Sequence, residues 1–334
     1  MSTAVILMNL GTPAEPTAPA VKSFLRDFLS DPRVVEIPRP LWLAILHGLV
    51  LPLRPRRIAP AYAEIWGRSA DGEPVQGSPL LYYTRRQAEL LQEYFGERRR
   101  DITVAHAVTY GKPGLESVVD GLRREGFESF IVFPLYPQYS ATTTAAIYDQ
   151  VAQIFRSSRD IPDISVVKDY YQNSHYIRAL ASSVRDHWEK RGPAEKLLLS
   201  FHGIPKANIK KGDPYYRQCS ETAEHLAAEL GLRAEQWQVS FQSRFGKAEW
   251  LQPYTDKTLI EWGKQGVASV DVICPAFSAD CLETLEEISV ENRANFLNAG
   301  GKDYRYIPAL NLRRDHIEAL AAIVEQKLPA QSAR

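Results

Sequence analysis

A single histidine stands at the end of a short apolar run in the second half of the chain. Leu197–Ser200 predicts a buried strand, and His202 follows it just before a turn at Gly203. Open parallel sheets bind ligands just beyond the carboxyl ends of their strands, so His202 stands where chemistry would be done. An imidazole can accept a proton near neutral pH or bind a metal ion. The alternative is that His202 only closes the strand.

A series of carboxylates follows another apolar run. In a helix over Asp280–Glu291, Glu283, Glu287 and Glu291 would stack on one face at intervals of four residues. Such like charges destabilise a helix by about 0.2–0.5 kcal/mol per pair unless a cation, a proton or water intervenes. The series begins at the same sheet edge as His202, so it could pass protons or a divalent cation such as Fe(II). A solvated face is the alternative.

Common catalytic motifs are absent from the sequence. There is no HExxH or paired CxxC spacing, so a permanently bound catalytic metal is not indicated. The GxSxG, GxxxxGK[ST] and GxGxxG patterns of hydrolases, P-loop enzymes and dinucleotide oxidoreductases are also missing. Aromatic residues instead accompany the expected strand ends, among them Tyr139, Trp250 and Phe277. A large flat ligand with an apolar face and a polar rim suits this mixture, although such rings often belong to a core.

The elements that must position these residues repeat along the chain. Strands alternate with helices in both halves, which predicts an α/β fold of two doubly wound parallel sheets facing each other across a cleft. Three turns recur in the same order: GTP and GIP, YGK and FGK, and PQYS and PAFS. An internal duplication explains this order. It places Leu10 at the position that corresponds to His202, so only the second half has a titratable group there.

Composition narrows the function further. The chain of 334 residues has 40 Lys+Arg and 40 Asp+Glu, a balance that argues against nucleic-acid binding. Its three cysteines form no disulfide framework, which suggests a reducing compartment. The N-terminus has no basic segment before its apolar run, so we expect no signal peptide and a cytoplasmic protein.

One apolar stretch, Leu41–Leu53, stands between arginines. It is shorter than the roughly 20 residues that a transmembrane helix needs. Two interpretations remain open: a helix buried in the core, or a lip that rests on a membrane surface, with Trp42 and Leu46 among the residues in contact.

Six motifs together resemble the ferrochelatase family, which inserts Fe(II) into porphyrin in the last step of haem synthesis. They are LMNLGTP at the N-terminus, GSPL at 77–80, YPQYSATTT at 136–144, SFHGIP at 200–205, GDPYY at 212–216 and FSADCLETLEE at 277–287. The resemblance implies two Rossmann-like, flavodoxin-type domains of the chelatase superfamily. We expect these over residues 1–160, with the lip at 41–53, and residues 161–309, with a C-terminal helix in 310–334 that packs back on the first domain.

The resemblance also implies roles for residues. His202 accepts the pyrrole protons and can touch the metal, while Glu283 faces it across the porphyrin and delivers iron or removes protons. Glu287 and Glu291 match an acidic path leading outward. The remaining matches line the porphyrin site: Leu10, Ser78, Tyr139, Trp250 and Phe277.

Departures from the family pattern carry further expectations. No cysteine follows Cys281, so we expect no [2Fe–2S] cluster and no permanent cofactor, with Fe(II) as a substrate. Cys281 stands where many members have histidine. A coproporphyrin-using subgroup has tyrosine at the position of Leu10, so leucine favours protoporphyrin IX. We expect a monomer that touches the inner membrane through Leu41–Leu53. The alternatives are a coproporphyrin or cobalt chelatase, and a non-catalytic porphyrin carrier.

Overall fold

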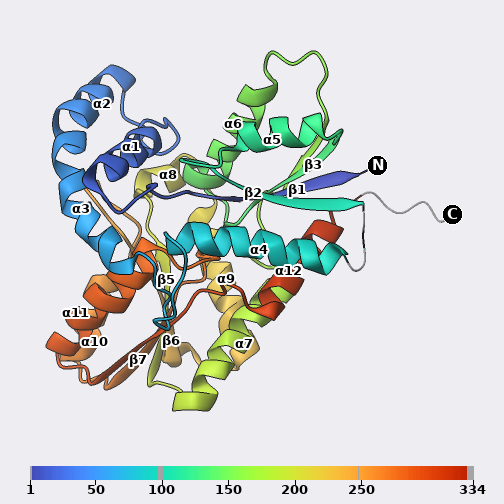
Figure 1. The fold of residues 1–334 in the computed structure, drawn as a ribbon. Coiled ribbons are helices and arrows are strands. Elements are labelled where there is room, and N and C mark those ends of the chain that lie inside the picture. Colours follow the sequence, from blue (N-terminus) through green and yellow to red (C-terminus); the bar gives the residue numbers. More distant parts are fainter. Residues whose placement is uncertain (1, 97–98, 100, 247, 329–334) are drawn as a thin grey trace.

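The computed structural model describes residues 2–96, 99, 101–246 and 248–328. Two parallel sheets of four strands form its two lobes (Figure 1), which confirms the predicted fold class. The first sheet has the order β2-β1-β3-β4 and the second the order β6-β5-β7-β8, so the two orders are equivalent. The strands are β1 (Thr3–Asn9), β2 (Ile102–Val108), β3 (Ser129–Pro134), β4 (Asp163–Val166), β5 (Lys196–His202), β6 (Trp237–Gln242), β7 (Ser269–Ile273) and β8 (Asp303–Ile307).

Helices cover both faces of each sheet. The α-helices are α1 (Ala18–Leu29), α2 (Arg39–Ile45), α3 (Leu51–Ile65), α4 (Pro79–Gly96), α5 (Leu115–Arg124), α6 (Ala146–Phe155), α7 (Ser174–Arg191), α8 (Lys206–Lys210), α9 (Tyr215–Leu230), α10 (Thr255–Lys264), α11 (Arg293–Asn298) and α12 (Arg314–Glu325). Within the described ranges, three segments are π-helical, η1 (Leu46–Val50), η2 (Ala141–Ala145) and η4 (Glu283–Asn292), and η3 (Ala234–Gln236) is a 3₁₀ turn.

Alternate side chains of each central strand belong to different hydrophobic cores. In β1, Val5 and Leu7 join a core that the two lobes share, while Ile6 joins an outer core under α5 and α6. In β5, Leu199 joins the shared core and Leu198 the outer core under α10 and α11. Successive side chains of a strand point to opposite faces, so strands covered on both sides are apolar throughout.

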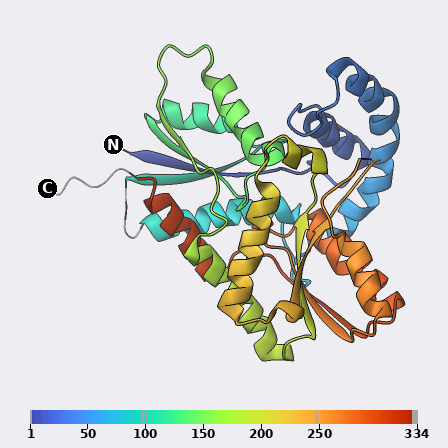
Figure 2. The same cartoon turned by 180° about the vertical axis from the view of Figure 1, so that it is seen from behind.

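The shared core consists largely of four helices between the sheets. Leu91 of α4, Leu180 of α7, Leu226 of α9 and Leu320 of α12 are all buried in it. Helix α12 packs against α4 of the first lobe and α7 of the second, and α7 packs against α9. Seen from behind, α12, α7 and α9 lie side by side (Figure 2). The C-terminal helix therefore contacts both lobes.

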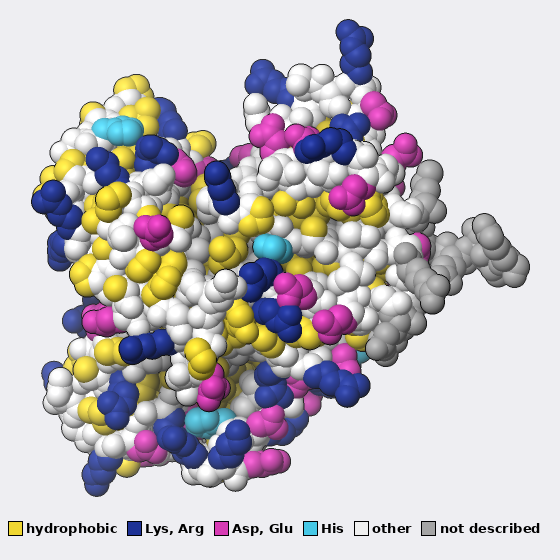
Figure 3. All heavy atoms as spheres, viewed as in Figure 1, with side chains coloured by type: hydrophobic (Ala, Val, Ile, Leu, Met, Phe, Trp, Pro, Cys, Tyr) yellow, Lys and Arg dark blue, Asp and Glu magenta, His cyan; other side chains and the backbone are white. Residues whose placement is uncertain are grey.

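The apolar stretch over Leu41–Leu53 is amphipathic and is not buried on all sides. Trp42 and Leu46 are 6% and 0% exposed and pack in a core with α1 and α3, so the expectation that they contact a membrane is wrong. Leu41, Leu49 and Leu53 are each 57% exposed. We call these three side chains the lip patch. In Figure 3, hydrophobic and basic side chains are interspersed over α1–α3.

No helix among the described residues is both long and apolar enough to cross a bilayer.

Candidate functional site

His202 is the last residue of β5, so the strand runs two residues further than its apolar pattern predicts. The order of the second sheet reverses beside β5, between β5 and β7, and ligands bind at such switch points. The Nδ1 of His202 lies 2.6 Å from the carbonyl oxygen of Gly203. A carbonyl can only accept, so Nδ1 carries the hydrogen. In the neutral ring, Nε2 then has the free lone pair that can take a proton or a metal ion.

Gly203 allows the turn after His202 to pack closely. A Cβ on Gly203 would lie 2.8 Å from the backbone oxygen of Gln242 and 3.2 Å from the Trp250 ring. The N–H of Gly203 donates to the same Gln242 oxygen at 2.8 Å. A side chain at position 203 would push His202 away from β6, so only glycine fits there.

Aromatic rings surround the end of β5. The ring centroid of Phe277, which follows β7, lies 6.5 Å from that of His202. Trp250 is 6% exposed, and its ring centroid is 5.3 Å from that of Phe245. No hydrogen-bond partner for the Trp250 Nε1–H is found among the described residues. The structure thus brings Phe277 and Trp250 to the histidine.

Glu283 begins η4, which is a π-helix where the sequence predicts an α-helix. Side-chain bonds also span five residues, from Ser289 Oγ to Thr284 O and from Asn292 Nδ2 to Glu287 O, both at 2.9 Å. Residues four apart still lie near one another in this wider helix, and the charges of Glu283 and Glu291 both help to raise the pKa of Glu287. Glu283 and Glu287 are half-buried and Glu291 is exposed.

Gln242 links the histidine strand to Glu283. It is the register partner of His202 on β6, and its Nε2 donates to the backbone oxygen of Glu283 at 3.2 Å. Its Oε1 accepts from Ser200 Oγ at 2.7 Å, which fixes the orientation of the amide. His202 and the first residue of η4 are therefore held in one frame by a single side chain.

Glu287 lies deeper than an ordinary surface carboxylate. Burial raises its pKa to about 7, with smaller contributions from the charges of Glu283 and Glu291. Ser243 opposes this shift because its N–H donates to Oε1 at 2.7 Å and its hydroxyl donates to Oε2. A carboxyl group with this pKa exchanges protons readily at neutral pH.

Two residues of α3 lie near Glu283 that the sequence pattern does not single out. Burial lowers the pKa of Arg54, and the charge of the Glu283 carboxylate opposes that shift. It also adds to the effect of burial in raising the pKa of Tyr62. The Arg54 guanidinium lies 4.9 Å from the Phe245 ring centroid, so it spans from α3 to the second lobe. In the sequence, the one indication that Arg54 and Tyr62 belong together is their separation of eight residues within one helix.

Leu10 follows β1 and packs in the same cluster as Leu282 and Leu285 of the η4 region. The structure therefore places Leu10 in the apolar cluster that also includes the two leucines flanking Glu283. It occupies the switch point of the first sheet, as His202 does in the second.

Tyr139 lies at the seam between the lobes. Its N–H donates to Oε1 of Gln218 on α9 at 2.6 Å, and the Lys168 ammonium is 5.5 Å from its ring centroid. Burial raises the pKa of its hydroxyl, and the charge of Arg33 opposes that shift. The charge of Asp213 adds to the rise, and Arg33 is paired with Asp149 at 2.6 Å. Lys168 is therefore the cation better placed for a carboxylate of a ligand.

Ser78 is buried directly before α4. The hydrogen bond described for it is local, from the Tyr82 N–H to its carbonyl oxygen at 2.9 Å. The described contacts do not bring it to His202 or Glu283.

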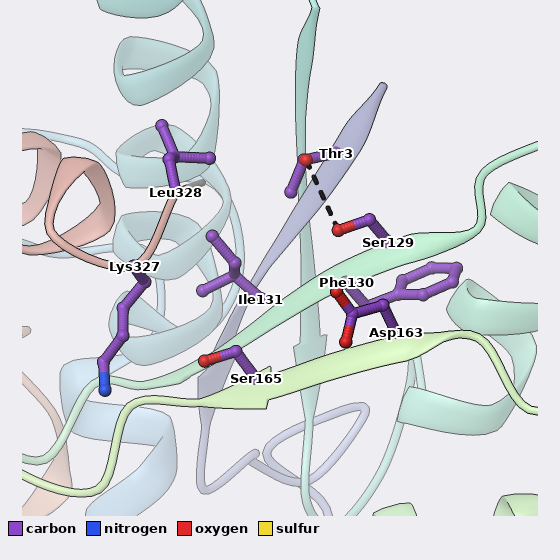
Figure 4. Close-up of a pocket in the computed structure, with 8 residues that line it drawn as sticks. All are labelled: Thr3, Ser129, Phe130, Ile131, Asp163, Ser165, Lys327 and Leu328. Atoms are coloured by element: carbon purple, nitrogen blue, oxygen red, sulfur yellow. Dashed lines mark hydrogen bonds between the residues drawn. The ribbon is translucent and has the colours of Figure 1, made fainter. Parts of the chain in front are cut away.

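The hollow in Figure 4 lies away from this group of residues. Thr3, Ser129 and Asp163 line it at the amino ends of β1, β3 and β4, whereas His202 and Leu10 mark carboxyl ends. The described residues include no cluster of three or more His, Cys, Asp or Glu side chains that could hold a metal ion.

The family model described as Ferrochelatase matches residues 2–328. A protein named ferrochelatase from Dechloromonas aromatica (strain RCB) is 50% identical over 336 residues, covering 100% of this chain and 90% of the relative. One of the same name from Psychrobacter cryohalolentis is 52% identical over 322 residues, covering 96% and 93%.

Solved structures show the same fold at low identity. "SirB from Bacillus subtilis with Fe3+" has a TM-score of 0.57 at 13% identity and covers 98% of this chain and 95% of its own. The structure of CbiX, described as the terminal enzyme for siroheme biosynthesis in denitrifying bacteria, has a TM-score of 0.53 at 10% identity, covering 98% and 100%. These two support the fold alone.

Proposed function

Because this chain belongs to the ferrochelatase family, we propose that His202 and Glu283 carry out its reaction from opposite sides of a bound porphyrin. The enzyme is a metal-insertion lyase of haem biosynthesis, with Fe(II) and protoporphyrin as substrates. The observation that carries the assignment of roles is the Gln242 bridge between the histidine strand and Glu283.

His202 acts as the base in this proposal. A planar porphyrin keeps two N–H protons inside its ring, and a metal ion cannot enter the plane while they remain. A pocket that favours a puckered ring turns the nitrogen lone pairs outward, which stabilises the transition state over the ground state. The free Nε2 of His202 then accepts a pyrrole proton. The Phe277 ring supports the imidazole from one side.

Glu283 handles metal or protons on the other side. Glu287 and Glu291 continue from it toward the surface along η4, from half-buried to exposed. The pKa of Glu287, about 7, supports a role in passing protons or in exchanging a proton for a cation. We propose this series as the path to solvent.

The remaining site residues hold the ring. We propose that Leu10, Trp250 and Phe277 contact its apolar faces, because they lie at the two switch points or beside them. Tyr139, with Lys168 nearby, would hold its carboxylates. Ser78 is proposed from the family resemblance alone. All these residues come from one chain, so we propose that a monomer is active.

Two further proposals concern contact with a membrane and the need for a cofactor. The lip patch, with Arg39, Arg56 and Arg57 exposed around it, would rest on an anionic membrane surface at the cytoplasmic side. Catalysis would need no iron–sulfur cluster, since a [2Fe–2S] cluster is typically held by four Cys thiolates and the chain has three cysteines. Iron analysis of the purified enzyme tests the second point, and stoichiometric bound iron and sulfide would contradict it.

Anaerobic conversion of protoporphyrin IX and Fe(II) to haem, followed by absorbance, tests the proposed roles. His202→Ala should abolish insertion and leave porphyrin binding within about threefold. Glu283→Gln should lower kcat at least about tenfold, a loss typical of a missing proton-transfer or metal-handling group. Lost porphyrin binding in His202→Ala would favour a carrier. Faster turnover of coproporphyrin or Co(II) by the native enzyme would favour the corresponding alternative chelatase.

A further inference from the structure

Asp280 and Asn311 hold each other through a reciprocal pair of hydrogen bonds. The backbone N–H of Asp280 donates to Oδ1 of Asn311 at 2.8 Å, and Nδ2 of Asn311 donates to Oδ2 of Asp280 at 2.6 Å. Asp280 is 0% exposed. Asn311 has a φ of 43°, a left-handed conformation that asparagine and aspartate tolerate better than most residues. The pair joins two turns that are 31 residues apart in sequence.

The second oxygen of Asp280 fixes the start of η4. Its Oδ1 accepts from Tyr306 OH at 2.6 Å, from Thr284 Oγ1 at 2.9 Å and from Ala309 N at 3.4 Å. Thr284 directly follows Glu283, and its Oγ1 also accepts from the Cys281 N–H at 3.0 Å. The backbone on both sides of Glu283 is thereby tied to the buried carboxylate.

A glutamine of the first lobe fastens the same turns. The Nε2 of Gln87, on α4, donates to the backbone oxygens of Ser278 at 2.9 Å and Asn311 at 3.1 Å. His316 Nδ1 lies 3.0 Å from the same Asn311 oxygen, and burial lowers the pKa of His316 to about 4. The imidazole is therefore neutral at pH 7 and donates from Nδ1.

We propose that Asp280 and Asn311 are positioning residues for metal insertion, which act by fixing Glu283, and that Gln87 ties them to the first lobe. This inference rests on the proposed role of Glu283. Catalytic groups must be held near their productive geometry, and a displacement of about 1 Å can cost about 100-fold in rate. None of the three residues needs to touch the porphyrin or the metal.

Exchanging the two side chains tests the pairing. Asn311→Asp places a carboxylate oxygen against Oδ2 of Asp280, whose pKa burial already raises. Two buried carboxyl groups share a proton near neutral pH, so kcat is measured at increasingly alkaline pH, where that proton is lost and the two charges repel. We expect kcat to fall about 10- to 100-fold. Adding Asp280→Asn should return kcat to within about threefold of the native value. In the double variant, the amide at position 280 donates to the carboxylate at position 311. The amide oxygen at position 280 still accepts from Thr284, Tyr306 and Ala309.

Two further variants guard against simple misfolding. Gln87→Leu is close in size and leaves no carbonyl unpaired, because Ser278 O still accepts from Asn311 N at 3.1 Å and Asn311 O from His316. It should lower kcat about fivefold with little change in Tm. Asp271→Asn is the matched control: Asp271 is equally buried in the same lobe, but it pairs with Arg305. It should lower Tm and leave kcat per folded molecule unchanged.

The outcomes separate this inference from the proposed function. Porphyrin Kd, from fluorescence quenching, should stay within about threefold in every variant, so the loss falls on kcat. Native kcat in Asn311→Asp, or a folded double variant as slow as the single one, would overturn the inference. In a Glu283→Gln background, Asn311→Asp should add no further loss; an undiminished loss there also overturns it. Native kcat in Glu283→Gln itself would instead refute the role of Glu283.

Discussion

Ser243 donates two hydrogen bonds to the carboxylate of Glu287, one from its N–H at 2.7 Å and one from its hydroxyl. Ser243 has a φ of 65°, a strained left-handed conformation for serine, and these bonds help to hold it there. They also limit the rise in the pKa of Glu287 that burial causes.

The titration of Glu287 should make the free energy of unfolding depend on pH. Its pKa is about 7 in the folded protein and 4.5 in the reference state, so the folded state holds the proton more tightly. The resulting stability is complete below pH 4.5 and is lost as the pH rises through 7. Native protein should lose about 3 kcal/mol relative to Glu287→Gln between pH 4.5 and 8. Urea unfolding at several pH values measures this, and parallel curves for the two proteins would contradict it.

The hydroxyl of Ser243 should tune that titration. Ser243→Gly removes one donor and relieves the strained φ, so the pKa of Glu287 should rise further. In ¹³C NMR of labelled glutamate, the Glu287 midpoint should move above 7. An unchanged midpoint would mean that the hydroxyl bond contributes nothing in solution.

A methyl group on Gly203 should disturb catalysis through His202. Gly203→Ala places Cβ 2.8 Å from the Gln242 carbonyl oxygen, and overpacking of this kind costs about 1–3 kcal/mol. We expect a lower Tm and at least about a tenfold loss in kcat, since the histidine is displaced. Gly48→Ala, where a Cβ would meet no atom within 4 Å, is the control and should change neither. Equal behaviour of the two variants would refute the packing argument.

The indole N–H of Trp250 has no hydrogen-bond partner among the described residues, so removing it should cost little stability. Trp250→Phe removes a buried donor that lacks a partner among the described residues, so stability should fall by no more than about 1 kcal/mol. Trp250→Ala should cost about 3–5 kcal/mol because it leaves a cavity, and it should weaken porphyrin binding more than phenylalanine does. Chemical unfolding and porphyrin titration compare the two, and equal losses would contradict the prediction.

Membrane contact should depend on the lip patch. Changing Leu41, Leu49 and Leu53 together to Glu should abolish flotation with anionic vesicles, while kcat on detergent-dispersed porphyrin stays within about threefold. Ile161→Glu is the control, since Ile161 is 61% exposed outside the patch. If the triple variant floats like the native protein, the patch does not bind membranes.

Local patterns were sufficient to predict the architecture and the principal residues. The alternation of apolar strands with helices and the three repeated turns predicted two sheets, and the shared strand order agrees with that prediction. The turn after an apolar run was enough to place His202 at a strand end. Both inferences depend only on neighbours in sequence.

The parts that were not predicted depend on contacts between distant segments. A spacing of four residues fits an α-helix, so nothing in the Glu283–Glu291 pattern distinguishes the π-helix that the structure has. The proximity of Arg54 and Tyr62 to Glu283 arises from the packing of α3 against η4, more than 200 residues away. Apolar residues on every side of Leu41–Leu53 concealed which face is buried.

The helices shared between the sheets constrain how the molecule comes apart. Leu91 of α4 and Leu180 of α7 belong to one core, so neither lobe has a complete apolar interior without the other. A gene divided between β4 and β5 should yield two fragments that are each unfolded alone and gain structure only when mixed. Opening a wide hinge between the lobes would expose this shared core, so we expect the motion that admits a porphyrin to involve only the segments around the site.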